Sequence, residues 1–419
     1  MTISIMYDET LQPTEGFVKT PPQANPIQKK WVVVILALIM FTNTMDFMVL
    51  MPLGPKLISL FKITPQQFSF LVSAYSLTAG IFGLIGSLLF DRVDRKHALI
   101  GCYTGFLIGT LSCAFSPNYM FLLISRSIAG AFGGLLSGIC FAIITDLFSI
   151  HERGTALGKL MTSFSLAAII GVPFGLILAN HLGWHSTFIS IAIMGAIGLL
   201  LVQTFVPNVR SHLQNVRAGL FSGISDNLKD PNSRKALLTT FLMVLSQFVV
   251  IPFISAFLVA NTDFPESELP LLYLLGGAFT AVTGPLVGRL CDRYGAQHVF
   301  TKTGVLFLIP VFLITHLTHA PVWLTLFIST AFFVFSNSRM VPAMTIISSS
   351  IPSNRRGSFM SLNACLQQLG SASASFMGGW FVTQSAVSTE FVGFHNTAYL
   401  SAFFGVFAYY TARKIRSIS

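Results

Sequence analysis

Residues Ser87–Lys96 read Ser-Leu-Leu-Phe-Asp-Arg-Val-Asp-Arg-Lys, a short charged segment between two long apolar stretches. A second copy, Gly288-Arg-Leu-Cys-Asp-Arg-Tyr-Gly295, follows about two hundred positions later. Asp91-Arg92 and Asp292-Arg293 hold the same place in the two copies. A further pair of landmarks, Arg153-Gly154 and Arg356-Gly357, keeps nearly the same separation. A repeat that spans half of a chain indicates a duplicated architecture, so the sequence predicts two related halves.

The composition places both halves in a membrane. Of 419 residues, 10% are charged and 53% are hydrophobic, whereas a soluble domain carries about 25% charged residues. The formal net charge is +10, but the basic residues form no continuous stripe and stand at the ends of apolar stretches. This distribution argues against a nucleic-acid partner and favours a lipid bilayer. The five cysteines have neither metal-ligand nor paired spacing, so neither a metal site nor a disulfide framework is expected.

Twelve apolar stretches are long enough to cross a bilayer, because a spanning helix needs about 20 residues. They are 31–60, 68–90, 98–115, 119–149, 155–180, 186–207, 236–261, 269–291, 299–318, 322–351, 358–384 and 392–412. We therefore predict an all-α integral membrane protein with twelve transmembrane helices in two pseudo-symmetric six-helix bundles.

The polar segment 208–235 divides the twelve stretches into two sets of six. We expect an N-terminal bundle over 30–207, a cytoplasmic linker over 208–235 and a C-terminal bundle over 236–412. Residues 1–29 contain prolines and acidic residues but no apolar core, so they are expected to form a disordered tail, and 413–419 a short second tail.

Basic residues indicate the orientation. They gather in the loops after even-numbered stretches and near both termini, whereas the opposite side has little beyond Lys56 and Lys62. Since cytoplasmic loops carry an excess of lysine and arginine, both termini are expected in the cytoplasm.

Asp46 is the expected proton site. It lies 16 residues from both Lys30 and Lys62, near the middle of the first stretch. A charge in hydrocarbon is costly and usually marks a pathway, a proton relay or a counter-ion. Burial favours the protonated form of a carboxyl and a nearby guanidinium favours the ionised form, so a carboxyl whose partner can leave would change its protonation state. The alternative is a structural, hydrogen-bonded carboxyl. Asn43, one turn earlier, would share its face.

Two arginines also lie deep within apolar stretches, Arg126 in the fourth and Arg339 in the tenth. An arginine cannot deprotonate, but it can hold a carboxylate or an anionic substrate group. If Asp46, Arg126 and Arg339 line one cavity, that cavity is net positive while Asp46 is ionised, which would favour anionic or zwitterionic head groups. The alternative for Arg126 is a role in helix packing.

The eleventh stretch carries a polar stripe at i, i+4 spacing, made of Asn363, Gln367, Ser371 and Ser375. Such a stripe lies on one helix face and either lines a cavity or forms interhelical hydrogen bonds. Tyr75, Gln247 and Tyr273 are weaker candidates for substrate contacts.

Motifs of other protein classes are absent from the sequence. It contains no His-Glu-x-x-His, no Gly-x-Ser-x-Gly and no paired intramembrane aspartates, which argues against an intramembrane enzyme. No phosphate-binding loop of the Walker type is present, which argues against ATP-driven transport.

The two charged segments resemble the loop signature of the major facilitator superfamily, Gly-x-Leu-Ala-Asp-Arg-x-Gly-Arg-Lys, and more narrowly its twelve-span drug:proton antiporter branch. The first copy matches at Asp91, Arg92, Arg95 and Lys96, with Ser87 and Asp94 in place of the two glycines. The family pattern Arg-x-x-Gln-Gly falls on Arg126–Gly130, with Ala129 in place of glutamine. The antiporter signature of the fifth span appears only as Gly171-Val-Pro173-Phe-Gly175.

The resemblance implies a conformational latch on the cytoplasmic side. Asp91 would face the Arg356 end of the eleventh span, and Arg95 could reach Asp146 at the inner end of the fourth span. The cluster would hold the outward-open state together and release on inward opening. The residues that the resemblance implicates are Asp91, Arg92, Arg95, Asp146, Arg153, Asp292, Arg293 and Arg356.

Taken together, these features predict proton-coupled secondary active export of a small amphipathic or anionic compound by rocking of the two bundles. Asp46 and Arg126 would couple protons, and Asn43, Tyr75, Arg126, Gln247, Arg339, Asn363 and Gln367 would contact the substrate. We expect a monomer in the cell (inner) membrane with no cofactor beyond the proton gradient. The alternatives are an importer or facilitator of a nutrient, siderophore or lysolipid and, remotely, an intramembrane enzyme.

Overall fold

The computed structural model of the protein describes residues 25–89, 93–209, 220–352, 355–385 and 390–416. Within these ranges the chain is helical apart from short connections and one hairpin of β1 (Thr383–Gln384) and β2 (Phe391–Val392). Most of the tail expected over 1–29 lies outside the described residues, and the first helix already begins at Pro26.

The helices follow one another in two sets. The first set is α1 (Pro26–Val49), α2 (Gly54–Phe61), α3 (Pro65–Leu89), α4 (Arg95–Ala114), α5 (Tyr119–Leu147), α6 (Ile150–Leu166), η2 (Ala167–Gly171), α7 (Val172–Leu182) and α8 (His185–Phe205). The second set is α9 (Leu220–Lys229), α10 (Pro231–Phe248), η4 (Ile251–Phe253), α11 (Ile254–Asn261), η5 (Glu266–Glu268), α12 (Leu269–Tyr294), α13 (Ala296–Thr315), α14 (Val322–Ser338), α15 (Met340–Ser349), α16 (Arg356–Phe381) and α17 (Phe394–Arg413). The segment expected as a plain linker thus contains α9 and the start of α10.

Several helices begin at a side chain that caps them. Asn25, Asp94, Asn118 and Asp230 each accept a hydrogen bond from a backbone N–H two or three residues later, at 2.7–3.4 Å. Asparagine and aspartate are favoured at this position because the first N–H groups of a helix have no partner within it. These four residues therefore fix where α1, α4, α5 and α10 start.

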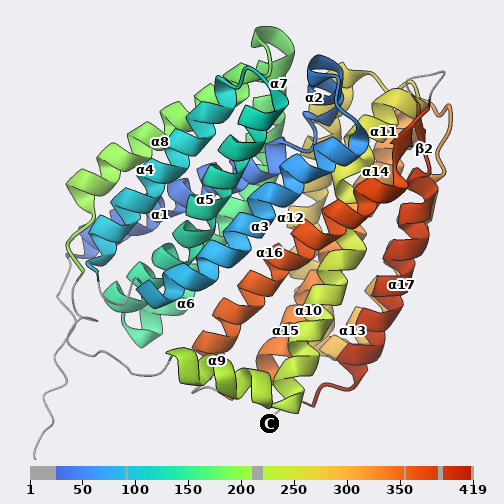
Figure 1. The fold of residues 1–419 in the computed structure, drawn as a ribbon. Coiled ribbons are helices and arrows are strands. Elements are labelled where there is room, and N and C mark those ends of the chain that lie inside the picture. Colours follow the sequence, from blue (N-terminus) through green and yellow to red (C-terminus); the bar gives the residue numbers. More distant parts are fainter. Residues whose placement is uncertain (1–24, 90–92, 210–219, 353–354, 386–389, 417–419) are drawn as a thin grey trace, which may run out of the picture.

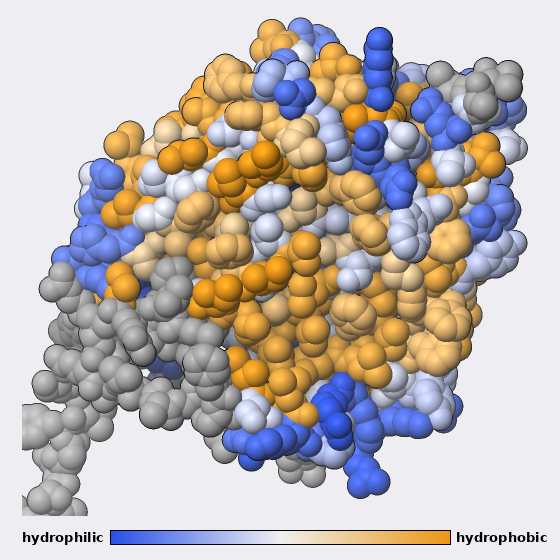
Figure 2. All heavy atoms as spheres, in the orientation of Figure 1, coloured by the Kyte–Doolittle hydropathy of each residue, from blue (hydrophilic) through white to orange (hydrophobic). Residues whose placement is uncertain are grey.

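The membrane prediction is confirmed. Ten stretches of the described chain are helices long and apolar enough to cross a membrane, and α16 and α17, with 26 and 20 residues, have the length to complete the twelve. Figure 2 shows a broad hydrophobic belt between two polar rims. Helices suit this environment because they satisfy their backbone hydrogen bonds internally.

Four of the expected spans are not continuous helices. The first and seventh break after Val49 and Phe248, at the places where Pro52 and Pro252 stand. Proline lacks the N–H that would continue the ladder. The fifth span contains the π-helical turn η2, and the tenth is interrupted at Arg339. The single span predicted over 31–60 is therefore two helices, α1 and α2.

The halves lie side by side with α3 and α16 in contact at their boundary (Figure 1). Ser73 Oγ donates to the Ala372 carbonyl oxygen at 3.0 Å, and the hydroxyls of Ser76 and Ser371 lie 3.2 Å apart. A Cβ built on Gly80 would lie 3.2 Å from Leu369 side-chain atoms. Small side chains let the backbones approach closely here.

The two halves share a hydrophobic core at one end only. We call the end with α2, α7, α11 and the hairpin the distal face, and the end with α9 and the described chain ends the terminal face (Figure 1). One cluster unites distal residues of both halves, among them Val49, Leu53, Val249 and Phe253. Toward the terminal face, the clusters contain residues of one half each. The structure is therefore closed between the halves at the distal face.

The contact between α3 and α16 predicts a cross-link. In a background without the native cysteines, Ser76→Cys with Ser371→Cys should form a disulfide on mild oxidation, because the two hydroxyls are already 3.2 Å apart. A protease site inserted into 210–219 allows the chain to be cut between the two halves. Halves joined by the disulfide would then still migrate together on a non-reducing gel. The control is Ser76→Cys with Ser361→Cys, because Ser361 lies ten residues, or about 15 Å, from Ser371 along α16. Equal cross-linking of both pairs would contradict this interface.

Candidate functional site

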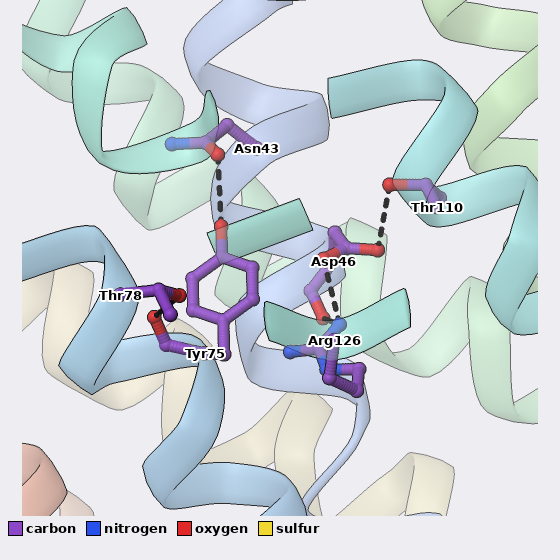
Figure 3. A network of polar contacts seen from close by, with 6 residues as sticks. All are labelled: Asn43, Asp46, Tyr75, Thr78, Thr110 and Arg126. Carbon is purple, nitrogen blue, oxygen red and sulfur yellow. Dashed lines mark hydrogen bonds and ion pairs between the residues drawn. The ribbon is translucent and has the colours of Figure 1, made fainter. Parts of the chain in front are cut away.

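Four helices bring polar side chains together in the N-terminal half (Figure 3). Asp46 comes from α1, Tyr75 from α3, Thr110 from α4 and Arg126 from α5. Asp46 stands three residues before the end of α1, close to the break at Pro52. Asp46, Thr110 and Arg126 are all fully buried.

Asp46 and Arg126 form an ion pair. Arg126 Nη1 donates to Asp46 Oδ2 at 2.7 Å and to the Asp46 carbonyl oxygen at 3.3 Å, and Thr110 Oγ1 donates to Asp46 Oδ1 at 3.1 Å. The side chains of both ions have 0% exposure. Each charge therefore depends on the other in a place where an unpaired charge is very costly.

Tyr75 and Asn43 extend this group toward the centre of the molecule. The Arg126 guanidinium carbon lies 4.4 Å from the centroid of the Tyr75 ring, a cation–π contact. The Tyr75 hydroxyl donates to Asn43 Oδ1 at 3.0 Å, and Asn43 Nδ2 donates to the Gly133 carbonyl oxygen at 3.4 Å. The prediction that Asn43 shares the face of Asp46 fits this arrangement (Figure 3).

Glycines on α5 make room for these contacts. A Cβ on Gly133 would lie 2.5 Å from the Tyr75 hydroxyl and 2.6 Å from Asn43 Oδ1. On the opposite side, a Cβ on Gly109 of α4 would lie 2.7 Å from the Ala129 nitrogen. Ala129, which replaces the family's glutamine, is thus enclosed against α4 with no exposed surface.

The structure does not bring Arg339 to this group. Arg339 is 3% exposed, and in the described chain its guanidinium donates to Ser246 Oγ at 3.1 Å and to the Met243 carbonyl oxygen at 3.3 Å. It also lies 3.7 Å from the Phe307 ring centroid. All three partners belong to the C-terminal half, whereas Arg126 is bound by Asp46 of the N-terminal half.

The two buried arginines nevertheless have matching partners. Asp46 stands six residues before Pro52, and Ser246 stands six before Pro252. Arg126 contacts Asp46 in the N-terminal half, and Arg339 contacts Ser246 in the C-terminal half. The C-terminal half therefore has a hydroxyl where the N-terminal half has a carboxylate. The sequence analysis did not single out Ser246. Its position two hundred residues after Asp46 would have indicated it.

The polar stripe of α16 serves two purposes. Asn363 Oδ1 accepts from Thr240 Oγ1 at 2.7 Å within the C-terminal half, whereas Ser371 contacts Ser76 across the halves. Gln367, between them on the same face, is partly buried. Ser375 is fully buried. Interhelical hydrogen bonding thus explains Asn363 and Ser371.

Gln247 lies beside the contact between the halves. It is partly buried on α10, next to Phe248, whose ring centroid is 6.1 Å from that of Phe47 on α1. Phe47 in turn is 5.4 Å from Tyr75. A chain of aromatic rings therefore runs from the Asp46–Arg126 group to the C-terminal half.

Several of the described latch residues make contacts within their own halves. Arg95 Nε donates to Asp146 Oδ2 at 3.3 Å, the contact that the resemblance implied. Arg153 Nε donates to the Phe148 carbonyl oxygen at 2.9 Å, and Arg356 Nη2 to the Ile351 carbonyl oxygen at 3.4 Å, each within its own half. The copies at Asp292 and Arg293 are exposed. Asp91 and Arg92 lie outside the described residues.

The site offers polar contacts but no metal chemistry in the described residues, where no group of three or more histidine, cysteine or acidic side chains is close enough to hold a metal ion. Thr110 was not anticipated from the sequence, because a lone threonine in an apolar span carries no distinguishing signal.

The chain is similar to known membrane transporters. The inner membrane transport protein YajR of Escherichia coli is 26% identical over 315 residues, 74% of this chain and 68% of that protein. A probable sugar efflux transporter of Mannheimia succiniciproducens is 25% identical over 259 residues, 62% of this chain and 64% of that protein. The crystal structure of a D-xylose-proton symporter matches 92% of this chain and 97% of its own with a TM-score of 0.76 at 18% identity, which shows the same fold.

The family model for the Major Facilitator Superfamily matches residues 36–231 and 236–416, nearly all of both helical halves. The protein is therefore a multi-pass membrane transporter of the Major Facilitator Superfamily, not an enzyme.

Proposed function

We propose that the protein exports a small polar, amphipathic or anionic compound in exchange for protons, with Asp46 as the proton carrier. It would act as a monomer in the cell (inner) membrane, with both termini in the cytoplasm, so that the terminal face is the cytoplasmic face. The basic residues at the terminal ends of the helices support this orientation. We also propose that the protein belongs to the drug:proton antiporter branch of the superfamily.

The observation that carries the proposal is the buried pair of Asp46 and Arg126. Arginine stays charged, so protonation of Asp46 would leave a buried cation without its carboxylate. Protonation therefore favours a rearrangement of α1 against α5. Since α1 breaks just beyond Asp46, such a rearrangement would reach the distal contact between the halves.

The substrate class follows from the unused donors of Arg126. Its Nε and Nη2 atoms have no hydrogen-bond partner within the described part of the chain. A carboxylate, a phosphate or a polyhydroxylated compound could accept from them while ionised Asp46 stays on Nη1, so that its binding would favour loss of the proton from Asp46. The sugar efflux relative supports a polyhydroxylated substrate. Asn43, Tyr75, Gln247 and Gln367 would supply further polar contacts near the boundary of the halves. The enclosure of Arg339 in the C-terminal half makes it the weaker candidate.

Proton release on ligand addition tests the proposal. Detergent-purified protein in weak buffer should release protons when a substrate from a panel of sugars, anionic amphiphiles, cationic dyes and lysolipids binds. Asp46→Asn should reduce the release at least tenfold, because the carboxyl that loses the proton is gone. Asp263→Asn, which changes an exposed carboxylate paired with His319, is the matched control. Binding by the wild type without proton release would refute proton coupling.

The pair itself should show strong energetic coupling. Arg126→Gln should lower the stability by about 3–5 kcal/mol, because it leaves Asp46 buried and unpaired. The double variant with Asp46→Asn should be more stable than Arg126→Gln alone, as measured by thermal unfolding in detergent. The exposed pair of Lys29 and Glu152, at 2.8 Å, is the comparison, and its removal should lower the stability far less, because exposed ion pairs contribute little. Additive effects of Asp46→Asn and Arg126→Gln would contradict the coupling.

We further propose that Arg95 and Asp146, which already pair within the N-terminal half in this structure, belong to a latch that engages the Arg356 end of α16 only in the state open at the distal face. Asp146→Asn should then increase the population closed at the distal face and raise the rate of Ser76–Ser371 cross-linking severalfold. Asp146→Glu, which keeps the charge, should restore the wild-type rate. An unchanged rate in Asp146→Asn would refute the latch.

A further inference from the structure

A cavity of about 450 Å³ opens between the start of α1 and the start of α6, apart from the Asp46 group. Its lining is polar toward the terminal face and apolar along α1. The basic side chains are Lys29, Lys30, His151 and Lys159, and the apolar ones include Val33, Val34 and Phe148. Ligand sites in proteins commonly measure about 300–1,000 Å³, so this cavity is large enough for a small head group.

The charge of the cavity is positive. Glu152 is its one acidic lining residue in the described chain, and Lys29 Nζ already lies 2.8 Å from Glu152 Oε2. Ser149 also donates to the same oxygen, from its N–H at 3.3 Å and its hydroxyl at 3.0 Å. Glu152 is thus engaged with Lys29 and Ser149, and Lys30 and Lys159 remain as exposed cations at the cavity.

Lys159 stands where a membrane protein rarely places a charge. It lies two turns inside α6, on the same face as His151 and Thr155, at i, i+4 and i+8 spacing. A lysine at this depth extends its side chain toward the head-group level, where it needs an anion. On α1, Val34 follows Lys30 by one turn and is 51% exposed. The surfaces of α1 and α6 that line the cavity therefore carry the cations Lys30 and Lys159, with the apolar Val34 beside them.

We propose that this cavity binds the head group of an anionic phospholipid from the cytoplasmic leaflet. The phosphate would lie between Lys30 and Lys159 with His151 nearby, and an acyl chain would follow Val34. Basic cavities between helices on the cytoplasmic side are the places where anionic head groups bind. The apolar stripe favours a lipid over a free phosphate of the same charge. The assignment of the leaflet rests on the orientation proposed above.

The occupant would act on the helix that carries Asp46. Lys29, Lys30 and Val34 belong to α1, and the lipid would connect this helix to α6 in the same half. Binding would therefore stabilise the packing of α1 against α6, beyond what the pair of Lys29 and Glu152 contributes. Since it stabilises a folded arrangement, the lipid should raise the unfolding temperature with increasing concentration.

Thermal unfolding in detergent tests the site with defined lipids. Phosphatidylglycerol should raise the unfolding temperature of the wild type, whereas phosphatidylcholine at the same concentration should not. Lys30→Gln with Lys159→Gln should weaken the apparent affinity for phosphatidylglycerol at least tenfold. The control is Arg289→Gln with Lys302→Gln, which removes two exposed charges from the C-terminal half and should leave the affinity unchanged.

Three outcomes would overturn the proposal. Equal weakening in both double variants would mean that the lipid responds to overall charge rather than to this cavity. An equal shift with inorganic phosphate or glycerol phosphate would mean a phosphate site without lipid recognition. No shift with phosphatidylglycerol would mean no site. Substrate-induced proton release in Lys30→Gln with Lys159→Gln separates this proposal from the role of Asp46, because that release should persist.

Discussion

An ion pair sealed from water joins the helices of the N-terminal half. Asp46 of α1 and Arg126 of α5 are fully buried and 2.7 Å apart, with Thr110 of α4 on the second carboxylate oxygen and the Tyr75 ring of α3 beside the guanidinium. In hydrocarbon neither ion could remain charged alone at modest cost. The position of α1 is therefore tied to the charge of one carboxyl, and the break at Pro52 allows the part of the chain beyond it to move separately.

The contacts between the halves complement this arrangement. At the distal face they share one core, and α3 and α16 meet through serines and glycines as well as through the stacked rings of Phe70 and Phe376. Small residues permit close approach of the two backbones. The π-helical turn η2 also lies at this boundary, since a Cβ on Gly277 of α12 would be 3.0 Å from the Ile169 Cα. π-helical turns occur frequently at functional sites.

The sequence was sufficient for the architecture because hydropathy and the paired loop segments depend on local composition. It also identified Asp46 and Arg126, since a charge in an apolar span stands out by itself. It could not show their partners: Thr110 is an ordinary residue of α4, and Arg339 looked equivalent to Arg126 until the structure placed it against Ser246 and Phe307. Helix breaks at 50–53 and at Arg339 were missed, although Pro52 stands in the first and the polar residues 336–339 stand at the second. Side-chain direction, which decides which face an intramembrane charge occupies, is set by tertiary packing.

If Asp46 is the proton carrier as proposed, the hydroxyl of Ser246 at the matching place in the C-terminal half limits the energetics of transport. Among the described membrane helices, Asp46 is the one fully buried carboxyl. A carrier that uses this group moves at most one proton through it per cycle. For a neutral solute, a tenfold gradient then requires about 59 mV of proton-motive force. Under that proposal, a second carboxylate at the position of Ser246 would double the logarithm of the concentration ratio that a given proton-motive force can sustain.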